Sequence, residues 1–348
     1  MSRENINIYA IAKEAGVSPA TVSRVLTKNA TVSKEKRERV QALIDKYNFK
    51  PNTLARRLSN TESKMIGILV ADVRNPFYAS LFVECEKAAS AKGYTVLLCN
   101  SLGENKLENE HLEGLYEQRV DAIIQIGGRV DELVSDEEYV EHVNRIADFM
   151  PVIITGKLDG AECYQVNIDQ CYAMEILMEY LIKLGHTEIA LIGGRKDVKS
   201  TYDKRLRYRQ LLRRHGIEFN KEWIIEGKHY DIESGYECMN KLFESKEKLP
   251  SALIAINDFT AIGILRSIRE HGLDIPNDIS VASFDNTFVS EVATPKLTTI
   301  SYDYKLFGET LIDVAIDAIH KKKPLPMQLI KSELVVRDSC KRINRNRS

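Results

Sequence analysis

Short apolar runs alternate with amphipathic segments from Met65 to about residue 285, and this alternation limits the possible folds more than any other feature of the chain. Each run is short enough for a strand and is apolar at nearly every position, so both faces of the strand must be covered. Such strands occur in parallel sheets between layers of helix. The expected strands have the sequences MIGILV, YTVLLCN, DAIIQI, PVIIT, IALIGG, WII, ALIAI and ISVASF.

The alternation occurs twice, so two successive α/β subdomains are expected. The first series ends with the strand near 151–155, and the second begins near Val166. In such folds the carboxyl ends of the strands face a crevice, which predicts a ligand cleft between the subdomains. The expected helices cover residues 76–92, 104–118, 171–184, 203–215, 234–244 and 259–271.

The first 64 residues form a basic head on an acidic body. They contain thirteen Lys and Arg against six Asp and Glu, a net charge of +7. The remaining residues carry 36 basic and 44 acidic side chains, a net charge of −8. A charge asymmetry of this kind indicates that the head meets a polyanion, although a solvated charged surface would look the same.

A helical pattern in the head breaks at Gly-Val-Ser-Pro and resumes at once. Gly16 permits the left-handed backbone that ends a helix, Ser18 suits the cap of the next helix, and Pro19 suits its first position. A third amphipathic stretch follows Ser33. Two short helices joined by a tight turn and completed by a third form a helix-turn-helix unit, whose second helix enters the DNA major groove.

The motifs of several other classes of protein are missing from the sequence. There is no export signal, no apolar segment long enough to cross a membrane and no Cys-x-x-Cys pair, so we expect a cytoplasmic protein with reduced thiols. GGRKDVKST fails the phosphate-loop pattern, and no nucleophile elbow or metal-ligand spacing of histidines occurs. We therefore expect no enzyme, metal or cofactor. A solute-binding protein of a transporter remains a less favoured alternative.

The motifs of both parts resemble those of the LacI/GalR family of bacterial transcription regulators. The head carries AGVS-xxTVSRVL and PN-xxARxL, and the body carries MIGILVADVRNPFY, KLGHTEIALIGG, IAINDFTAIGILRSIREHGLDIPNDISVASFDN and PKLTTIS. The resemblance implies an all-α helix-turn-helix head and a periplasmic-binding-protein-like α/β body with two doubly wound parallel-sheet subdomains.

The resemblance also implies domain boundaries. The expected parts are a DNA-binding domain at 1–50, a hinge helix and linker at 51–62, an effector-binding and dimerisation domain at 63–340 and a disordered tail at 341–348. Three crossings, near Val166, Thr294 and Met327, would divide the body into one subdomain of 63–165 plus 295–326 and another of 166–294 plus 327–340.

In the family, the residues after the capping Ser contact base edges. Here Pro19 and Ala20 offer only apolar contact, so Arg24 is the expected donor to a base edge or phosphate, with a solvated helix residue as the alternative. Leu58 matches a leucine that wedges between base steps. The expected DNA-binding residues are Tyr9, Ser18, Pro19, Ala20, Thr21, Ser23, Arg24, Thr31, Ser33, Asn52, Ala55, Arg56 and Leu58.

The cleft residues are carried over from the same resemblance. Asn257 could instead cap a helix, Phe77 could belong to the core, and Arg205 and Arg209 share a helix with Arg207. Asp285 directly follows a buried strand, which favours a function. The expected effector-binding residues are Asn75, Phe77, Tyr78, Arg207, Tyr230, Asn257, Asp258 and Asp285.

We expect a homodimeric, ligand-responsive regulator of transcription that binds pseudo-palindromic double-stranded operator DNA. A repressor of carbohydrate-utilisation genes with a sugar or sugar derivative as effector is the first hypothesis, and a nucleobase, nucleoside or other small metabolite is the alternative. The tail RDSCKRINRNRS has no apolar heptad for a coiled coil, which favours a dimer. No membrane partner is expected.

Overall fold

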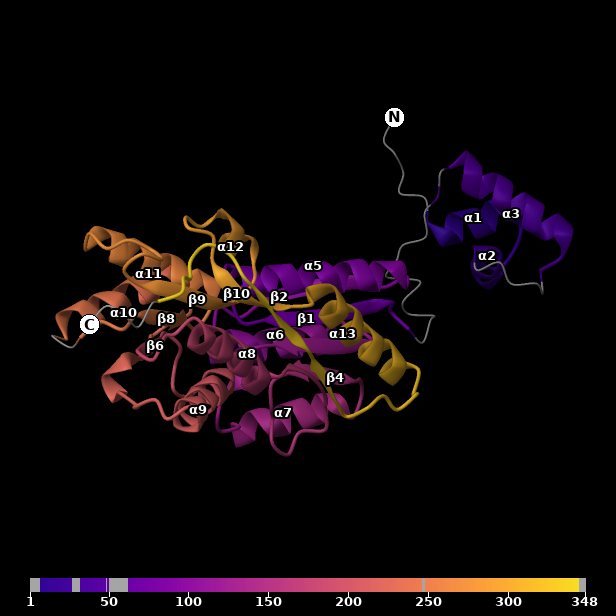
Figure 1. The fold of residues 1–348 in the computed structure, drawn as a ribbon. Coiled ribbons are helices and arrows are strands. Elements are labelled where there is room, and N and C mark those ends of the chain that lie inside the picture. The colour runs from indigo at the N-terminus through magenta and orange to yellow at the C-terminus, as the bar shows by residue number, and fades with distance from the viewer. Residues whose placement is uncertain (1–6, 27–31, 48, 50–61, 246–247, 344–348) are drawn as a thin grey trace. The chain divides into compact units, whose positions relative to one another are not determined.

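The chain is divided into two compact units, a head at Met1–Ser63 and a body at Lys64–Ser348. The computed structural model describes every residue except 1–6, 27–31, 48, 50–61, 246–247 and 344–348 (Figure 1). The elements described in the head are all helices, and the body consists of two sheets with helices on both faces. This architecture confirms the expected fold class.

The head contains α1 (Ile8–Ala15), α2 (Pro19–Leu26) and α3 (Lys34–Lys46). Gly16 ends α1 with a φ of 63°, and the Ser18 hydroxyl accepts the backbone N–H of Thr21 at 3.2 Å, as the sequence predicts. The three helices enclose a small apolar core. Its buried members are Ile11, Ala12, Ala15, Val22, Val25, Val40 and Ile44.

A polar contact joins the first and third helices. Glu14 on α1 accepts hydrogen bonds from Lys46 Nζ and the Tyr47 hydroxyl, both at 2.9 Å. These two donors lower the pKa of Glu14, since they favour its ionised form. The contact therefore helps to fix α3 against the helix pair.

The first sheet of the body has the order β11-β5-β4-β3-β1-β2 and is parallel throughout. Its strands are β1 (Met65–Val70), β2 (Thr95–Asn100), β3 (Ala122–Ile126), β4 (Val152–Thr155), β5 (Tyr164–Ile168) and β11 (Met327–Ile330). The helices of this subdomain are α5 (Pro76–Ala91), α6 (Asn105–Glu117), the 3₁₀ turn η1 (Gly128–Asp131), α7 (Glu137–Ala147) and α13 (Tyr304–Ile319).

The second sheet has the order β12-β10-β9-β8-β6-β7, and only its edge pair β10–β12 is antiparallel. Its strands are β6 (Ile189–Ile192), β7 (Ile224–Ile225), β8 (Ala252–Ala255), β9 (Ser280–Asp285), β10 (Thr298–Tyr302) and β12 (Ser332–Val335). The helices are α8 (Gln170–Lys183), α9 (Lys199–Arg214), η2 (Lys221–Trp223), α10 (Ile232–Glu244), α11 (Asp258–Glu270) and α12 (Phe288–Val292).

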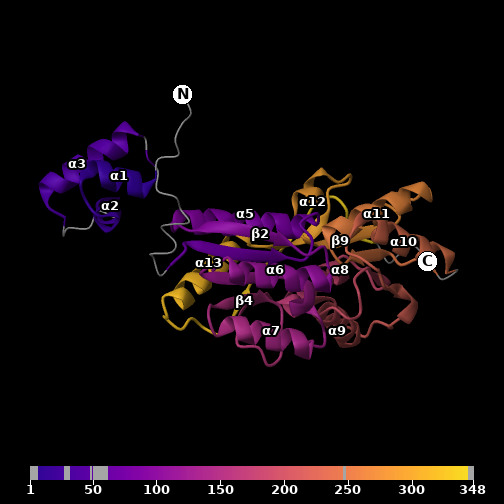
Figure 2. The same cartoon turned by 180° about the vertical axis from the view of Figure 1, so that it is seen from behind.

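Each sheet has an apolar core on both faces. The first packs against α5 and α13 on one side and against α6 and α7 on the other. The second packs against α8 and α9 on one side and against α10 and α11 on the other. In both views of the ribbon, α7 and α9 lie on the same side of the body (Figures 1 and 2). The double coverage explains the continuous apolar runs of the strands.

The chain passes between the sheets at Asp169, Asp303 and Lys331, which we call the first, second and third crossovers. The expected crossing near Val166 is close to the first. The crossings expected near Thr294 and Met327 were misplaced, because β10 pairs with β9 in the second sheet and β11 pairs with β5 in the first.

The C-terminal residues correct another expectation. Residues 341–348 were expected to be disordered, yet the Lys341 N–H donates to Ser280 Oγ at 3.1 Å and the Ile343 N–H donates to the Leu184 carbonyl at 3.0 Å. These bonds attach the chain to the second subdomain as far as Ile343. The last five residues lie outside the part that the structure describes.

Candidate functional site

The second helix of the head and its capping residue present several accessible side chains. Ser18, Ala20 and Arg24 are exposed, while Thr21 and Ser23 are half-buried. The Ser18 and Thr21 hydroxyls are 3.0 Å apart, so the cap also orients the Thr21 side chain. Because α2 begins at Pro19, its first turn presents backbone N–H groups beside these side chains.

Two other expected DNA contacts lie on the surface of the head. Tyr9 on α1 is 70% exposed, so it is not part of the core, and the Asn7 side chain caps the helix beneath it at 3.0 Å. Ser33 precedes α3 and is exposed, but its side chain makes no capping hydrogen bond. The remaining expected contacts lie outside the described residues: Thr31, Asn52, Ala55, Arg56 and Leu58.

The body contains a cleft of about 1210 Å³ between its subdomains. Its wall includes six of the eight residues expected to bind an effector, and these come from the ends of strands and starts of helices in both subdomains. The six are Asn75, Phe77, Tyr78, Tyr230, Asn257 and Asp285.

A buried ammonium and two carboxyl groups form the polar centre of the cleft. Lys204 on α9 is 6% exposed and Asp285 at the end of β9 is 7% exposed. Burial raises the pKa of Asp285 to about 7, and the nearby Lys204 charge opposes this rise. Burial likewise lowers the pKa of Lys204, against the attraction of Asp285 and Asp131. The Lys204 ammonium also lies 4.4 Å from the centre of the Phe284 ring.

The backbone of Asp285 supports a functional role for this residue. Its φ is 101°, a conformation that residues with a side chain seldom adopt, and it ends a strand in which every residue is buried. The Tyr304 hydroxyl donates to the Asp285 carbonyl at 2.9 Å and helps to hold this conformation. Strain of this kind is concentrated at ligand sites.

Asp131 of the first subdomain caps a helix of the second. Its Oδ1 accepts the Ser200 N–H at 3.0 Å and its Oδ2 accepts the Ser200 hydroxyl at 2.6 Å. Burial raises the pKa of Asp131 to about 6, although the Ser200 donors favour the ionised form. The Leu133 N–H adds a bond to the Asp197 carbonyl at 2.8 Å, so the two walls of the cleft are joined at this point.

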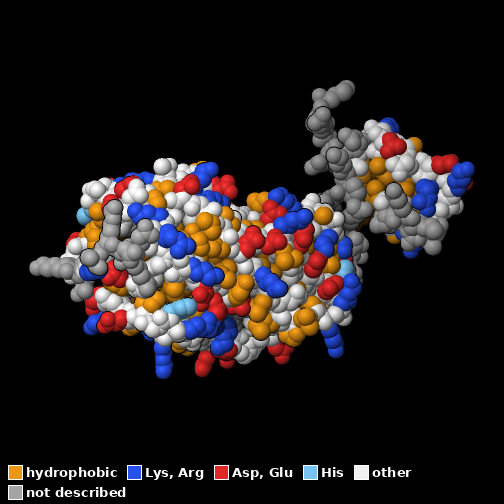
Figure 3. Space-filling model, in the orientation of Figure 1, with side chains coloured by type: hydrophobic (Ala, Val, Ile, Leu, Met, Phe, Trp, Pro, Cys, Tyr) orange, Lys and Arg blue, Asp and Glu red, His pale blue; other side chains and the backbone are white. Residues whose placement is uncertain are grey.

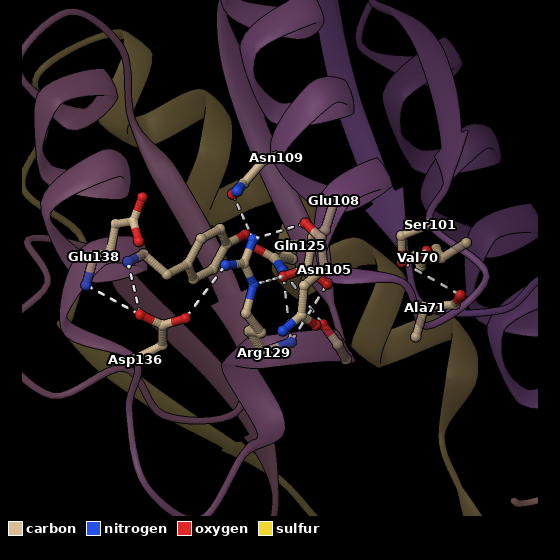
Figure 4. Close-up of polar contacts among 12 residues, drawn as sticks. Val70, Ala71, Ser101, Asn105, Glu108, Asn109, Gln125, Arg129, Asp136 and Glu138 are labelled. Carbon is tan, nitrogen blue, oxygen red and sulfur yellow. Dashed lines mark hydrogen bonds and ion pairs between the residues drawn. The ribbon is translucent and has the colours of Figure 1, made fainter.

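A buried ion pair supports the turn that carries Asp131. Arg129 donates to Glu108 at 3.1 Å and to the Asn105 carbonyl at 3.2 Å, and it also contacts Asp136 (Figure 4). Glu108 is so close to the turn that a Cβ on Gly128 would lie 2.1 Å from its Oε2, and Gly128 has a φ of 73°. The glycine is therefore needed for both space and backbone conformation.

Aromatic rings from both subdomains meet at the base of the cleft. Phe77 on α5 lies 6.2 Å from Tyr302 and 5.9 Å from Tyr304, measured between ring centres. Phe77 also packs against the cores of both subdomains. It serves as a core residue at the same time as it lines the cleft.

Three of the expected residues make structural hydrogen bonds within the wall. Asn75 Oδ1 caps α5 by accepting the Phe77 N–H at 3.1 Å. Asn257 Oδ1 caps α11 at 2.8 Å, while its Nδ2 donates to the Tyr230 carbonyl at 3.2 Å, so the capping alternative for Asn257 holds. The Tyr230 hydroxyl lies 2.7 Å from Thr201 Oγ1.

Two expected residues do not line the cleft. Asp258 is fully buried, and its carboxylate binds the side chains of Ser283, Thr299 and Thr287, which makes it a structural residue. Arg207 is absent from the cleft lining, and its side chain pairs with Glu175 on α8.

The spacing along α9 could have identified Lys204 in place of Arg207. The buried positions of this helix are 201, 204, 205, 208, 211 and 212. Lys204 is in phase with this stripe, whereas Arg207 is not. No sequence pattern of this kind identifies Asp131 or Tyr302 as a cleft residue, because their places in the cleft depend on how the subdomains pack.

Neither a metal site nor a membrane-spanning helix is found among the described residues. Among them, no group of three or more His, Cys, Asp or Glu side chains could hold a metal ion. Within the same residues, no helix has the length and apolar character needed to cross a membrane.

Two family models match the chain. The model of bacterial regulatory proteins of the lacI family matches residues 7–52, and the periplasmic binding protein-like domain matches residues 178–340. Among solved structures, the lac repressor dimer bound to operator and the anti-inducer ONPF has a TM-score of 0.86 at 26% identity, covering 97% of this chain and all of that one. A complex of the transcriptional regulator CelR with cellobiose has a TM-score of 0.71 at 25% identity, covering 96% and 100%.

Curated relatives match over nearly the full length. The HTH-type transcriptional repressor PurR of Histophilus somni is 32% identical over 339 residues, which are 96% of this chain and 98% of that protein. Catabolite control protein A of Priestia megaterium is 32% identical over 298 residues, covering 85% and 87%. The chain therefore belongs to the LacI/GalR family of bacterial transcription regulators, and it is a ligand-responsive DNA-binding repressor.

Proposed function

We propose that the protein acts as a homodimer whose heads bind a pseudo-palindromic operator, and that a nucleobase or nucleoside in the cleft of the body controls operator affinity. The observation that carries the proposal is the cleft itself, where buried Lys204 and Asp285 lie among aromatic side chains. Such a site combines flat apolar surfaces with a few polar anchors, as small-molecule sites do.

The similarity to the PurR repressors favours the nucleobase class over the carbohydrates that were the first hypothesis. Rings such as Phe77, Tyr78 and Tyr230 provide apolar faces on which a planar heterocycle can stack. Lys204 would donate to an acceptor atom of the ligand, and Asp285 would accept from an N–H or hydroxyl group.

A sugar effector remains the second candidate. It is favoured by the similarity of the chain to the cellobiose complex of CelR over 96% of its length. A panel of free nucleobases, nucleosides and sugars, tested by isothermal titration calorimetry on the full chain, separates the two classes.

For DNA recognition, we propose that α2 enters the major groove with Ser18, Pro19, Ala20, Thr21 and Arg24 towards the bases. The exposure of Ser18, Ala20 and Arg24 supports this assignment. Tyr9, Ser23 and Ser33, together with Thr31, would contact phosphates. The hinge residues Asn52, Ala55, Arg56 and Leu58 would bind the minor groove, and this remains a prediction.

Exposed apolar side chains support the proposed dimer. Val83 on α5 is 43% exposed, Leu98 on the edge strand β2 is 39% exposed, and Phe288 and Val292 on α12 are 66% and 71% exposed. In both ribbon views α5 and α12 lie on the same side of the body. On the face of the body drawn in Figure 3, charges of both signs are interspersed with apolar groups.

In vitro selection of DNA fragments by the full-length protein tests the proposed function. We expect the selected fragments to share two inverted half-sites, and a nucleobase or nucleoside to change their affinity. Selection of a single unrepeated site would contradict the dimeric mode of binding. A change in affinity with sugars alone would contradict the proposed effector class.

A further inference from the structure

Polar atoms without a hydrogen-bond partner lie beside all three crossovers. They are Gln170 Oε1, Tyr302 OH and Ser332 Oγ, which are buried and have no partner among the described residues. Gln170 is adjacent to the first crossover, Tyr302 to the second and Ser332 to the third. Buried polar groups are nearly always hydrogen-bonded in folded proteins, so a cluster of exceptions points to a binding partner at this place.

The register of the strands brings the three crossovers together. Tyr302 is opposite Ser332 in the β10–β12 pair, and Ile168 is opposite Ile330 in the β11–β5 pair. The crossovers continue directly from these paired ends, so they lie next to one another. Gln170 and Tyr302 both line the cleft, which places two of the three unpartnered atoms at its base, and Ser332 is not part of the lining.

The two cleft-lining atoms have complementary hydrogen-bonding roles. Tyr302 is 2% exposed, and burial raises the pKa of its hydroxyl well above the usual range, so the hydroxyl stays protonated and can donate. Gln170 Oε1 is a carbonyl oxygen and can only accept. A ligand that satisfies both atoms must present an acceptor and a donor.

The surroundings favour a planar ligand with its polar atoms on one edge. Phe77 lies 6.2 Å from Tyr302, and Tyr304 lies 6.4 Å from Tyr302 between ring centres. A sugar carries hydroxyl groups around its whole perimeter, and several would be left unpaired against these rings. A nucleobase has apolar faces and a polar edge.

We propose that the base of the cleft is a subsite for the cyclic amide edge of a nucleobase, with Tyr302 donating to its ring carbonyl and Gln170 accepting from its ring N–H. The inference rests on the proposed nucleobase effector. It assigns a hydrogen-bonding role to two residues that the sequence did not single out. Because the crossovers connect the subdomains, a ligand held there contacts both of them.

The experiment compares hypoxanthine with purine on the full-length protein by isothermal titration calorimetry. Hypoxanthine has a ring N–H beside a carbonyl on its six-membered ring, and purine lacks both. We expect wild type to bind hypoxanthine roughly tenfold more tightly than purine, as one or two hydrogen bonds provide. Tyr302→Phe should remove most of this preference, and Gln170→Met should reduce it.

Tyr208→Phe is the matched control. The Tyr208 hydroxyl is also buried in the second subdomain, but it donates to the Ile189 carbonyl at 2.6 Å and does not line the cleft. This variant should have a lower midpoint of thermal unfolding and an unchanged preference for hypoxanthine. Tyr302→Phe should keep the midpoint of thermal unfolding and lose the preference for hypoxanthine. Its hydroxyl has no partner within the described part of the protein, so its removal breaks no hydrogen bond of the fold.

The outcomes separate the subsite from the proposed function. If Tyr302→Phe keeps the full preference for hypoxanthine, the subsite is overturned while the nucleobase effector stands. If wild type binds adenine but not hypoxanthine, the subsite is likewise overturned while the nucleobase effector stands, since adenine lacks the cyclic amide edge. If wild type binds sugars and no nucleobase, both the subsite and the proposed effector class are overturned.

Discussion

Asp131 and Ser200 belong to different subdomains and are joined by two hydrogen bonds, of 3.0 Å and 2.6 Å, across the cleft. The residue before α9, Val198, has no side chain that can cap the helix. Asp131 therefore performs for α9 the task that an N-cap residue usually performs within its own segment. The stability of α9 is in this way linked to closure of the cleft.

Removal of the Asp131 side chain should weaken both the fold and the site. Asp131→Ala leaves the Ser200 N–H without its partner, and we expect a loss of about 1–2 kcal/mol in the free energy of unfolding. Effector affinity should fall as well, since the closed cleft loses a contact. Urea denaturation and calorimetry measure the two effects.

Asp278→Ala provides the control for this change. Asp278 accepts the Asp274 N–H at 2.7 Å within the second subdomain and does not line the cleft. It should lose stability while keeping effector affinity. Equal effector affinities for Asp131→Ala and wild type would count against a role of Asp131 in closing the cleft.

Stability should depend on pH through the buried carboxyl groups. The pKa of Asp285 is about 7 and that of Asp131 about 6, both above the value of about 3.9 in an unfolded chain. The folded state therefore binds more protons between about pH 4 and 7, and the stability contributed by these groups is lost as the pH rises through this window. In Asp285→Asn the free energy of unfolding should fall less over this pH range than in wild type, by an amount on the order of 1 kcal/mol.

Urea denaturation at pH 5 and pH 8 measures this difference. Asp278→Asn serves as the comparison because its carboxyl group lies outside the cleft lining. The physical cause assigned to Asp285 is wrong if wild type and Asp285→Asn lose stability equally between the two pH values.

Lys204 should be essential for effector binding, whereas Arg207 should not. Lys204→Gln keeps a polar side chain but removes the charge beside Asp285, so we expect at least a tenfold loss of effector affinity. Arg207→Gln breaks a contact with Glu175 outside the cleft and should leave the affinity within about twofold. Calorimetry with the same ligand decides between the two residues. A large loss of affinity in Arg207→Gln with little loss in Lys204→Gln would support Arg207 as the effector-binding residue, as expected from the sequence.

Much of the fold could be predicted from the sequence because strands such as β1, β6 and β8 are nearly continuous apolar runs. The central strands β5 and β10 carry polar residues and do not give this pattern. The third crossover was misplaced since β11 has exposed Met327 and Leu329 and lacks that signal. Asp285 was carried over from the family resemblance, and its place directly after a buried strand added support for a function. Asp131 could not be predicted, since nothing local in the chain determines which helix of the other subdomain it caps.

Arg24 should contribute to operator binding. Arg24→Ala removes an exposed donor from α2, and we expect operator affinity to fall about tenfold without a change in the circular dichroism spectrum. Arg39→Ala on α3 is the control, since Arg39 is also exposed but lies within reach of Glu35 at 4.0 Å on its own helix. Fluorescence anisotropy with the selected operator measures both variants, and equal affinities would contradict the assignment of α2.

The central claim is that a ligand in the cleft of the body and an operator on the head are thermodynamically coupled. Operator affinity measured by fluorescence anisotropy, with and without a saturating nucleobase that binds the cleft, tests it most directly. We predict a change of about tenfold or more in wild type, with the same factor in nucleobase affinity when operator is present, and no change in Lys204→Gln. An operator affinity that stays constant while the nucleobase occupies the cleft would contradict the account.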